Sequence, residues 1–288
     1  MVGTSGAGAL SRVLVTGATG VLGRVVVGQA LALGHDVVGI SRRGGQVGGR
    51  VEAEPLDVRD RPAVRRVVSA ARPDLVVHTA YAQDDWATTA DGAAHVALAA
   101  RSAGARLVHV SSDVVFSGAD VMYAERALPD PVSPYGAAKA AAETAVAAID
   151  PSAVIARTSL IMGSRDCPME IRVGGLLDGT ATGELFTDDI RCPVHVSDLA
   201  AALLELGFAG ARGIRHVTGP DAVSRFEIGE LIAARDGLDR GVLRPGSRRE
   251  TGVPGPLDVR LDCSWTQSQL RTVLRGARDF LSDPEALD

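Results

Sequence analysis

A glycine-rich turn near the start of the chain, between a β-rich run and a helical run, restricts the fold more than any other feature. Residues 12–16 (R-V-L-V-T) are typical of a buried strand, and the stretch that ends near Leu33 has the pattern of a helix. The turn between them, T-G-A-T-G-V-L-G, carries Gly17, Gly20 and Gly23. A strand, a tight turn and a helix in this order begin a βαβ unit, so the sequence predicts a parallel sheet.

The same alternation of strands and helices continues to about residue 160. Further strands are expected at residues 36–41, 51–56, 74–79, 106–111 and 153–158, and helices at 62–71, 85–102 and 133–149. Parallel strands that alternate with helices are covered on both faces, and right-handed crossovers make the sheet doubly wound. The predicted fold class is therefore α/β, a doubly wound, Rossmann-like parallel sheet with a smaller C-terminal lobe.

After residue 160 the alternation ends, and glycine and proline become frequent. Helices are expected at residues 197–206 and 224–234, the second beginning with Ser224 and Glu227 at the spacing of a capping box. Residues 244–256 have the composition of a loop. We predict a Rossmann-like domain over residues 1–160 and a lobe over 161–288, from which a segment near 196–208 returns to the sheet domain.

The glycine turn has the chemistry of a dinucleotide site. Glycines let the backbone turn tightly and approach a pyrophosphate, while the following helix N-terminus supplies free N–H groups and the positive end of a dipole. A turn that only requires positive φ is the simpler interpretation. The position of Gly17, Gly20 and Gly23 between the first strand and the first helix favours the nucleotide site.

The end of the second expected strand indicates which dinucleotide binds. NAD sites usually offer an acid here to the ribose 2′-hydroxyl, but this chain has Ser41, Arg42 and Arg43. Arginine binds a 2′-phosphate through its planar fork of donors, although these two arginines are alternatively solvated loop charges. We therefore predict NADP as cofactor, with NADPH preferred over NADH.

Two residues after the third expected strand extend the site. Asp57 and Val58 occupy the position that contacts the adenine edge in such folds, and Asp57 is equally suited to cap the following helix. The complete set that we expect to bind the cofactor is Gly17, Thr19, Gly20, Val21, Leu22, Gly23, Ser41, Arg42, Arg43, Asp57, Val58, Thr79, Ala80 and Tyr81, together with Tyr135 and Lys139.

Tyr135 and Lys139 stand four residues apart at the start of an Ala-rich helix, so both side chains lie on one helix face. An ammonium group near a phenol stabilises the phenolate and lowers its pKa from about 10, which suits acid–base work on a carbonyl oxygen. Ser112, after the fifth strand, is placed to hydrogen-bond that oxygen. A chance Y-x-x-x-K match is the alternative. It is weakened because Lys139 is the chain's one lysine, beside 29 arginines (30 − 1).

Composition excludes several classes of function. A net charge of −5 argues against nucleic acid as a partner, and no apolar run approaches the roughly 18 residues of a membrane span. We find no pattern of an export signal, and the three cysteines are spaced for neither a disulfide framework nor zinc. The histidines show no metal-binding spacing, so we expect no metal. We therefore expect a cytoplasmic protein that acts on a small molecule.

Several motifs together resemble those of the extended short-chain dehydrogenase/reductase superfamily, from about Val13 to the C-terminus. They are T-G-A-T-G-V-L-G, L-D-V-R-D, P-D-L-V-V-H-T-A, S-S-D-V-V-F-S-G and Y-G-A-A-K. Within the superfamily the chain is most similar to the dTDP-4-dehydrorhamnose reductase branch. The motifs for the branch are R-T-S-L-I-M-G, F-T-D-D-I-R-C-P-V-H-V-S-D-L-A and P-L-D-V-R-L-D. Many superfamily members have asparagines that relay protons, and this chain has none.

The resemblance implies transfer of a hydride from NADPH to the 4-keto group of a nucleotide-activated deoxysugar. It implies Ser112, Tyr135 and Lys139 as the catalytic residues, a substrate cleft between the lobes and, by analogy, a homodimer. Arg191 is suited to a diphosphate, although a surface ion pair is the simpler interpretation. The expected substrate contacts are Ser112, Tyr135, Met162, Arg165, Arg191 and Arg260.

Two other functions fit the same resemblance. One is a different enzyme of the superfamily, an epimerase or a reductase of a non-sugar carbonyl. The other is a non-catalytic, NADP-binding regulatory subunit, as in the β subunit of methionine adenosyltransferase. An epimerase would show no net oxidation of its cofactor, and a regulatory subunit would not depend on Tyr135.

Overall fold

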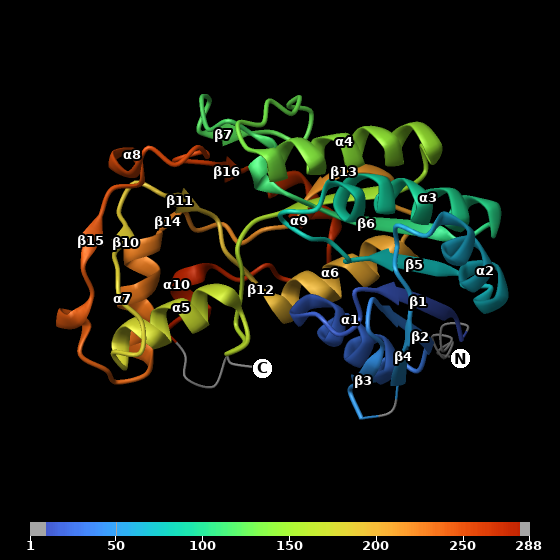
Figure 1. The fold of residues 1–288 in the computed structure, drawn as a ribbon, viewed down its shortest axis with the longest axis horizontal. Coiled ribbons are helices and arrows are strands. Elements are labelled where there is room, and N and C mark those ends of the chain that lie inside the picture. Colours follow the sequence, from blue (N-terminus) through green and yellow to red (C-terminus); the bar gives the residue numbers. More distant parts are fainter. Residues whose placement is uncertain (1–9, 50, 283–288) are drawn as a thin grey trace, which may run out of the picture.

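The computed structural model describes residues 10–49 and 51–282, and an eight-stranded sheet forms the centre of that part (Figure 1). The strand order is β3-β4-β2-β1-β5-β6-β8-β13, with every neighbouring pair parallel except β3 and β4. The parallel strands are β1 (Arg12–Thr16), β2 (Asp36–Ser41), β4 (Val51–Pro55), β5 (Leu75–His78), β6 (Arg106–Ser112), β8 (Val154–Thr158) and β13 (Gly213–His216). The predicted doubly wound α/β fold is confirmed.

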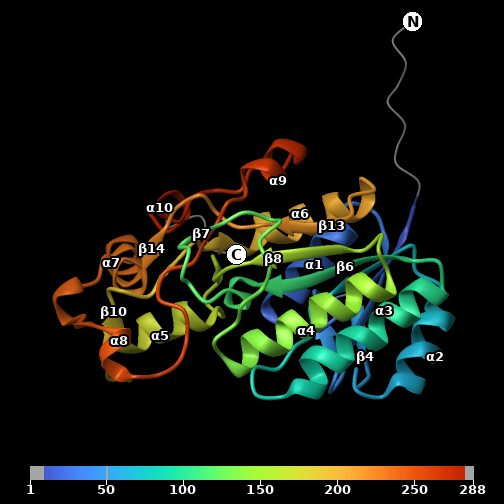
Figure 2. The same cartoon turned by 90° about the horizontal axis from the view of Figure 1, so that it is seen from above.

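Helices cover both faces of this sheet, as Figure 2 shows. One face packs against α1 (Val21–Ala32) and α6 (Val196–Phe208), and the other against α2 (Arg61–Ala71), α3 (Gly92–Ser102) and α4 (Pro134–Ile149). The side chains of β1 alternate between the two cores, with Val13 and Val15 in the first and Leu14 in the second. All three are fully buried, which explains the unbroken apolar run that predicted this strand.

The predicted strands and helices of the first 160 residues are confirmed within a residue or two, with one difference. The expected helix at 85–102 begins as a π-helical turn, Ala87–Asp91, before α3. Two strands of the central sheet were not predicted, β3 (Gly45–Val47) and β13 (Gly213–His216), and each lies at an edge of that sheet. In β13 the residues before His216 are only half-buried, so the run lacks the apolar pattern of an inner strand.

The C-terminal part builds a second layer around its own apolar core, to which Leu185, Ile228, Ile232 and Phe280 contribute. Its helices are α5 (Pro168–Leu177), α7 (Arg225–Arg235), α8 (Arg248–Thr251), α9 (Ser264–Gln269) and α10 (Ala277–Phe280). Short strand pairs join its segments, namely β9 (Ile161–Met162) with β12 (Val194–His195), β10 (Leu185–Phe186) with β15 (Pro245–Gly246) and β11 (Ile190–Arg191) with β14 (Val223–Ser224). A fourth pair joins β16 (Arg260–Leu261) to β7 (Met122–Tyr123), which comes from the first half of the chain.

Two expectations for this part have different outcomes. One of the two hydrogen bonds of the predicted capping box is present at the start of α7: Ser224 Oγ accepts a hydrogen bond from the Glu227 N–H at 3.0 Å. The segment 244–256 is not wholly loop, because it contains β15 and α8. Since β15 is a two-residue strand held by its partner β10, local composition gave no signal of it.

Two segments from beyond residue 160 lie in the sheet layer. Helix α6 packs beside α1 on one face of the sheet, and β13 extends the sheet beyond β8. The division of the chain near residue 160 stays a prediction. No helix in the described part of the chain is both long and apolar enough to span a membrane.

Candidate active site

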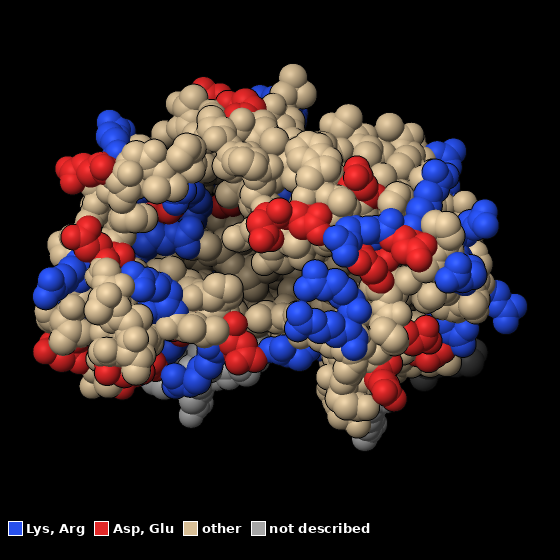
Figure 3. All heavy atoms as spheres, viewed as in Figure 1, with Lys and Arg blue, Asp and Glu red and all other residues tan. Residues whose placement is uncertain are grey.

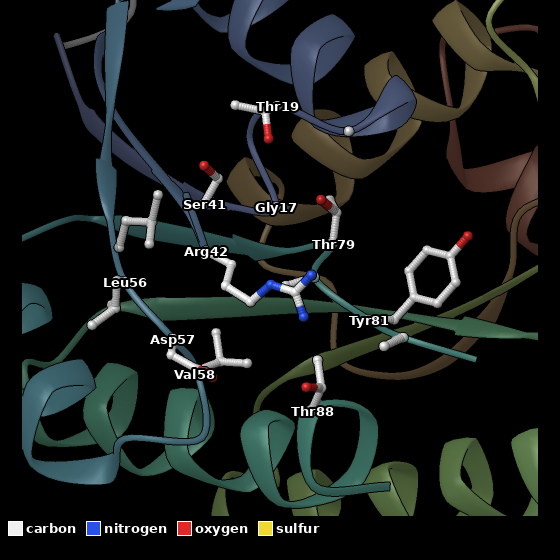
Figure 4. A pocket seen from close by; sticks show the side chains of 14 residues that line it. Gly17, Thr19, Ser41, Arg42, Leu56, Asp57, Val58, Thr79, Tyr81 and Thr88 are labelled. Atoms are coloured by element: carbon white, nitrogen blue, oxygen red, sulfur yellow. The ribbon is translucent and has the colours of Figure 1, made fainter. Parts of the chain in front are cut away.

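Two adjoining cavities lie where the parallel strands end, which is where open α/β sheets bind ligands. The smaller, of about 270 Å³, is drawn in Figure 4, and the larger has about 510 Å³. Gly17, Gly20, Thr79 and Tyr81 line both, so the glycine turn lies between them. Figure 3 shows a hollow in this face of the molecule, with basic side chains on its wall toward the C-terminal lobe.

The glycine turn leaves no room for side chains. Gly17 has φ +68°, and a Cβ on it would lie 2.8 Å from Thr79 Oγ1. A Cβ on Gly23 would lie 2.2 Å from the carbonyl oxygen of Gly17, closer than any real contact. Helix α1 follows with Gly20 as its N-cap and no side chain capping its free N–H groups. The open helix end and the bare backbone fit the pyrophosphate of a dinucleotide.

Five residues outside the glycine turn were expected to bind the adenosine end of the cofactor, and four of them line the smaller cavity. Ser41, Arg42, Asp57 and Val58 line it, whereas Arg43 does not. Figure 4 shows the Arg42 side chain extending across the middle of the view. The Ser41 hydroxyl instead donates to the Gly44 carbonyl at 2.9 Å and so holds the turn after β2. Of the two arginines after β2, only Arg42 lines this cavity.

Asp57 has a partner that the sequence did not predict. The Arg59 guanidinium donates to its carboxylate from Nη2 at 2.6 Å and from Nε at 3.0 Å. This hydrogen bonding lowers the pKa of Asp57. The alternative role of Asp57 as a helix cap is wrong, because Asp60 caps α2 by accepting from the Ala63 N–H at 2.9 Å.

Ser112, Tyr135 and Lys139 line the larger cavity together. Ser112 is the last residue of β6, and Tyr135 and Lys139 lie on α4. Ser133 caps the start of α4, because its hydroxyl accepts a hydrogen bond from the Gly136 N–H at 3.1 Å. Lys139 is 3% exposed, and its Nζ donates to the Val110 carbonyl at 2.9 Å. The same Nζ lies 6.0 Å from the centroid of the Tyr135 ring. The sequence spacing therefore brings the expected trio to one cavity.

The pKa of Tyr135 moves opposite to the expectation. Burial raises the pKa of the phenol above its usual value, and the neighbouring Tyr81 and Asp113 add to the increase. Burial lowers the pKa of Lys139 to about 8, against an opposing effect of Glu143. The hydrogen bond of the ammonium in the described residues goes to the Val110 carbonyl and not to the Tyr135 hydroxyl. Tyr135 therefore stays protonated, as a proton donor requires.

A buried ion pair supports this face of α4. Glu143, one turn beyond Lys139, accepts from Arg157 Nη2 at 2.8 Å and from the Ser111 hydroxyl at 2.5 Å. Arg157 is fully buried, and its Nη1 also donates to the Ala127 carbonyl at 3.1 Å. The pair ties α4 to β6 and β8 directly behind the expected catalytic residues.

Three of the expected substrate contacts lie outside the cavity wall. Met162 is fully buried in the core of the C-terminal lobe, because pairing of β9 with β12 leaves Ile161 on the cavity side. Arg165 is 70% exposed and lies 3.6 Å from Asp236. Arg260 donates to Asp258 at 2.7 Å. These three expectations are corrected, and only Arg191 of the basic candidates lines the cavity.

Several cavity residues were not predicted. Asp113 and Ser159 face each other there, with the Ser159 hydroxyl donating to Asp113 at 2.6 Å. Arg225 lines the cavity from the start of α7. The motif S-S-D-V-V-F, which contains Asp113, could have identified that residue. No sequence signal identified Arg225, because a charged residue after a capping serine is common in the first turn of a helix. The described residues hold no cluster of three or more metal-binding side chains.

Comparison with known proteins gives the family. A profile described as the RmlD substrate binding domain matches residues 11–283. The chain belongs to this family. It is 30% identical to dTDP-4-dehydrorhamnose reductase from Mycolicibacterium smegmatis over 291 residues, covering 96% of this chain and 85% of the relative. It is also 30% identical to methionine adenosyltransferase 2 subunit beta from Xenopus laevis over 273 residues, covering 88% and 80%.

Solved structures share the fold over nearly the whole chain. The dTDP-4-dehydrorhamnose reductase from Bacillus anthracis, in complex with NADP, has a TM-score of 0.84 at 24% identity and covers 94% of this chain and 97% of that one. MoeE5, in complex with UDP-glucose and NAD, has a TM-score of 0.80 at 26% identity and covers 96% and 98%. The fold thus occurs in complexes with either dinucleotide, and the family lies within the extended short-chain dehydrogenase/reductase superfamily.

Proposed function

We propose that the protein is an NADPH-dependent reductase of a keto group on a nucleotide-activated deoxysugar. The proposal rests on one observation: Ser112, Tyr135 and Lys139 line the larger cavity together. The glycine turn lines both this cavity and the smaller one beside it. Relatives at 30% identity over most of their length include a dTDP-4-dehydrorhamnose reductase, which supports the substrate class.

The chain's own residues supply the proton and hold the substrate. The protonated Tyr135 hydroxyl donates to the carbonyl oxygen as negative charge develops on it. Ser112 donates a hydrogen bond to the same oxygen and stabilises that charge. Lys139, fixed by the Val110 carbonyl, holds its ammonium beside the two tyrosine rings of the cavity, 5.2 Å from the Tyr81 centroid.

The cofactor would be held by residues of both cavities. The backbone of Gly17 and Gly20 and the open end of α1 would bind its pyrophosphate, with Arg42 at the adenosine end and Lys139 at the nicotinamide ribose. When bound, the dinucleotide supplies the hydride. The raised pKa of Tyr135 means that its hydroxyl carries its proton throughout the neutral pH range.

Arg42 gives a test of cofactor preference. We expect Arg42→Ala to lower kcat/KM for NADPH by about 10- to 100-fold, the loss typical of a hydrogen bond to a charged group, and to leave kcat/KM for NADH nearly unchanged. Arg43→Ala is the matched control, because Arg43 does not line the cavity. Steady-state kinetics with both cofactors measures this. Equal use of NADH and NADPH by the unaltered protein would contradict the proposed preference.

The reductase assay itself distinguishes the alternatives. Incubation with NADPH and a panel of dTDP-4-keto sugars is expected to consume NADPH and yield the corresponding alcohol. Conversion of a sugar without net NADPH oxidation would indicate an epimerase instead. The relative named as an adenosyltransferase subunit motivates one further outcome, a function through a partner that survives Tyr135→Phe.

The three free cysteines fit the predicted cytoplasmic location. A homodimer stays a prediction from the resemblance.

A further inference from the structure

Arg225 brings a basic side chain from the C-terminal lobe into the wall of the larger cavity. It is the first residue of α7, which lies in that lobe, whereas α1 and α4 belong to the sheet layer (Figures 1 and 2). Its backbone N–H donates to the Asp189 carbonyl at 3.1 Å, which fixes the start of the helix beside β11. The side chain is 21% exposed, so it is partly open to the cavity.

The charges around Arg225 do not balance. Buried Asp189 lies 3.0 Å from Arg191 Nη1, 3.4 Å from Arg225 Nε and 2.8 Å from Arg248 Nη1. Asp113, 3.6 Å from Arg191 Nε, is the second carboxylate of the cluster. Three guanidinium groups therefore share two carboxylates, which leaves one positive charge in excess. An excess cation at the wall of a cavity favours an anionic ligand.

Arg191 has its donors engaged with the protein. Its Nη1 donates to the Ile190 carbonyl at 2.7 Å and to the Leu257 carbonyl at 2.9 Å, and its Nη2 donates to the Pro256 carbonyl at 2.6 Å. Only its Nε side faces Asp113. Arg191 thus fastens residues 256–257 to β11, so its Nη1 and Nη2 donors already have protein partners.

Arg225 differs because donors remain for a ligand. Within the described residues its Nη1 contacts only Met169 Sδ, a weak acceptor at 3.9 Å, and its Nη2 makes no hydrogen bond. Burial lowers the pKa of this guanidinium, and the nearby Arg191 adds to that effect. Both effects mean that the charged form is less well stabilised here than in water, so a bound anion would stabilise it.

We propose that Arg225 binds the pyrophosphate bridge of a nucleoside-diphosphate substrate. The guanidinium offers a planar pair of donors that suits phosphate oxygens, and it lines the same cavity as Tyr135. The keto group would then lie at Tyr135 and the pyrophosphate at Arg225, in the opposite lobe. This assignment rests on the proposed function for its substrate class, and it makes Arg225 a substrate-binding residue rather than a catalytic one.

Binding of dTDP and of thymidine to the NADP-loaded protein tests the assignment by calorimetry. Arg225→Gln is expected to weaken dTDP binding by about 10- to 100-fold and to leave the affinities for thymidine and NADPH unchanged. Arg165→Gln is the matched control, since it removes the same charge from the same lobe outside the cavity wall. Arg225→Lys, which keeps the charge but loses the fork, is expected to give an intermediate affinity.

Two results would overturn the assignment. One is an unchanged dTDP affinity in Arg225→Gln, and the other is an equal loss in Arg165→Gln. Asp189 keeps Arg191 and Arg248 as partners in Arg225→Gln, so we expect the variant to fold. If it does not, inorganic pyrophosphate must still compete with dTDP for the unaltered protein, and a lack of competition would refute the site. If Arg225→Gln weakens dTDP binding but the unaltered protein reduces no keto sugar, the reductase proposal is contradicted and the assignment of Arg225 stands.

Discussion

Replacing Lys139 by methionine is expected to lower kcat/KM for keto-sugar reduction by about 10²-fold, the cost typical of losing a group that positions the reactants. Methionine has a similar length and is tolerated in buried sites, so the change removes the ammonium with little loss of packing. The Glu143–Arg157 pair one turn away stays intact. Circular dichroism and thermal melting should show a folded protein. Wild-type turnover by this variant would contradict the role given to Lys139.

The pH dependence separates a functional from a structural role of Lys139. Because its pKa is lowered to about 8, its ammonium is lost as pH rises through that value, and activity should fall there. The raised pKa of Tyr135 keeps the phenol protonated over the same range, so Tyr135 causes no loss. The residual activity of Lys139→Met should lack this decline near pH 8. Lys139→Arg is expected to be inactive as well, since the bulkier, planar head does not fit the buried site.

Glu143→Gln is expected to reduce the free energy of unfolding by about 3–5 kcal/mol, the cost typical of breaking a buried ion pair from one side. Arg157 is fully buried and Glu143 is 4% exposed, so the substitution leaves a guanidinium without its counter-charge. Glu143 also raises the pKa of Lys139, so its loss should move the alkaline decline in activity to lower pH. Urea denaturation and a pH profile measure the two effects.

An exposed ion pair provides the matched control for that prediction. Asp36 lies 2.6 Å from Arg12 Nε, closer than the 2.8 Å of the buried pair, but the two side chains are 48% and 41% exposed. Asp36→Asn should therefore cost less than about 1 kcal/mol, because water solvates both charges. If Asp36→Asn and Glu143→Gln destabilise equally, burial does not set the importance of the Glu143–Arg157 pair.

The sheet and the presence of Ser112, Tyr135 and Lys139 in one cavity were predictable because local patterns determine them. Leu14 and its neighbours form a continuous apolar run, and the glycine turn permits no side chain, so both leave a clear signal in the sequence. Tyr135 and Lys139 share a face through helix periodicity alone. The predicted fall in the pKa of Tyr135 was wrong because spacing does not show that the phenol is buried, which raises its pKa, or that Lys139 donates to the Val110 carbonyl.

The substrate side was less predictable because distant segments build it. Met162 and Ile161 differ only in which side of a two-residue strand each occupies, and pairing with β12 decides that. Arg191 and Arg225 lie far apart in the chain, and only the fold shows that one has its donors engaged while the other keeps donors for a ligand. Identifying a basic residue as a ligand therefore required its hydrogen-bond partners as well as its position.

The central claim is that Tyr135 donates the proton that completes reduction of a keto sugar. Its most direct test is the rate of NADPH oxidation with a dTDP-4-keto-6-deoxy sugar, measured for the unaltered protein and for Tyr135→Phe at equal NADPH saturation. We predict turnover by the former and a loss of about 10²- to 10⁴-fold in the latter, with NADPH affinity unchanged. Comparable rates in the two proteins, or no turnover of any keto sugar by a protein that binds NADPH, would contradict the account.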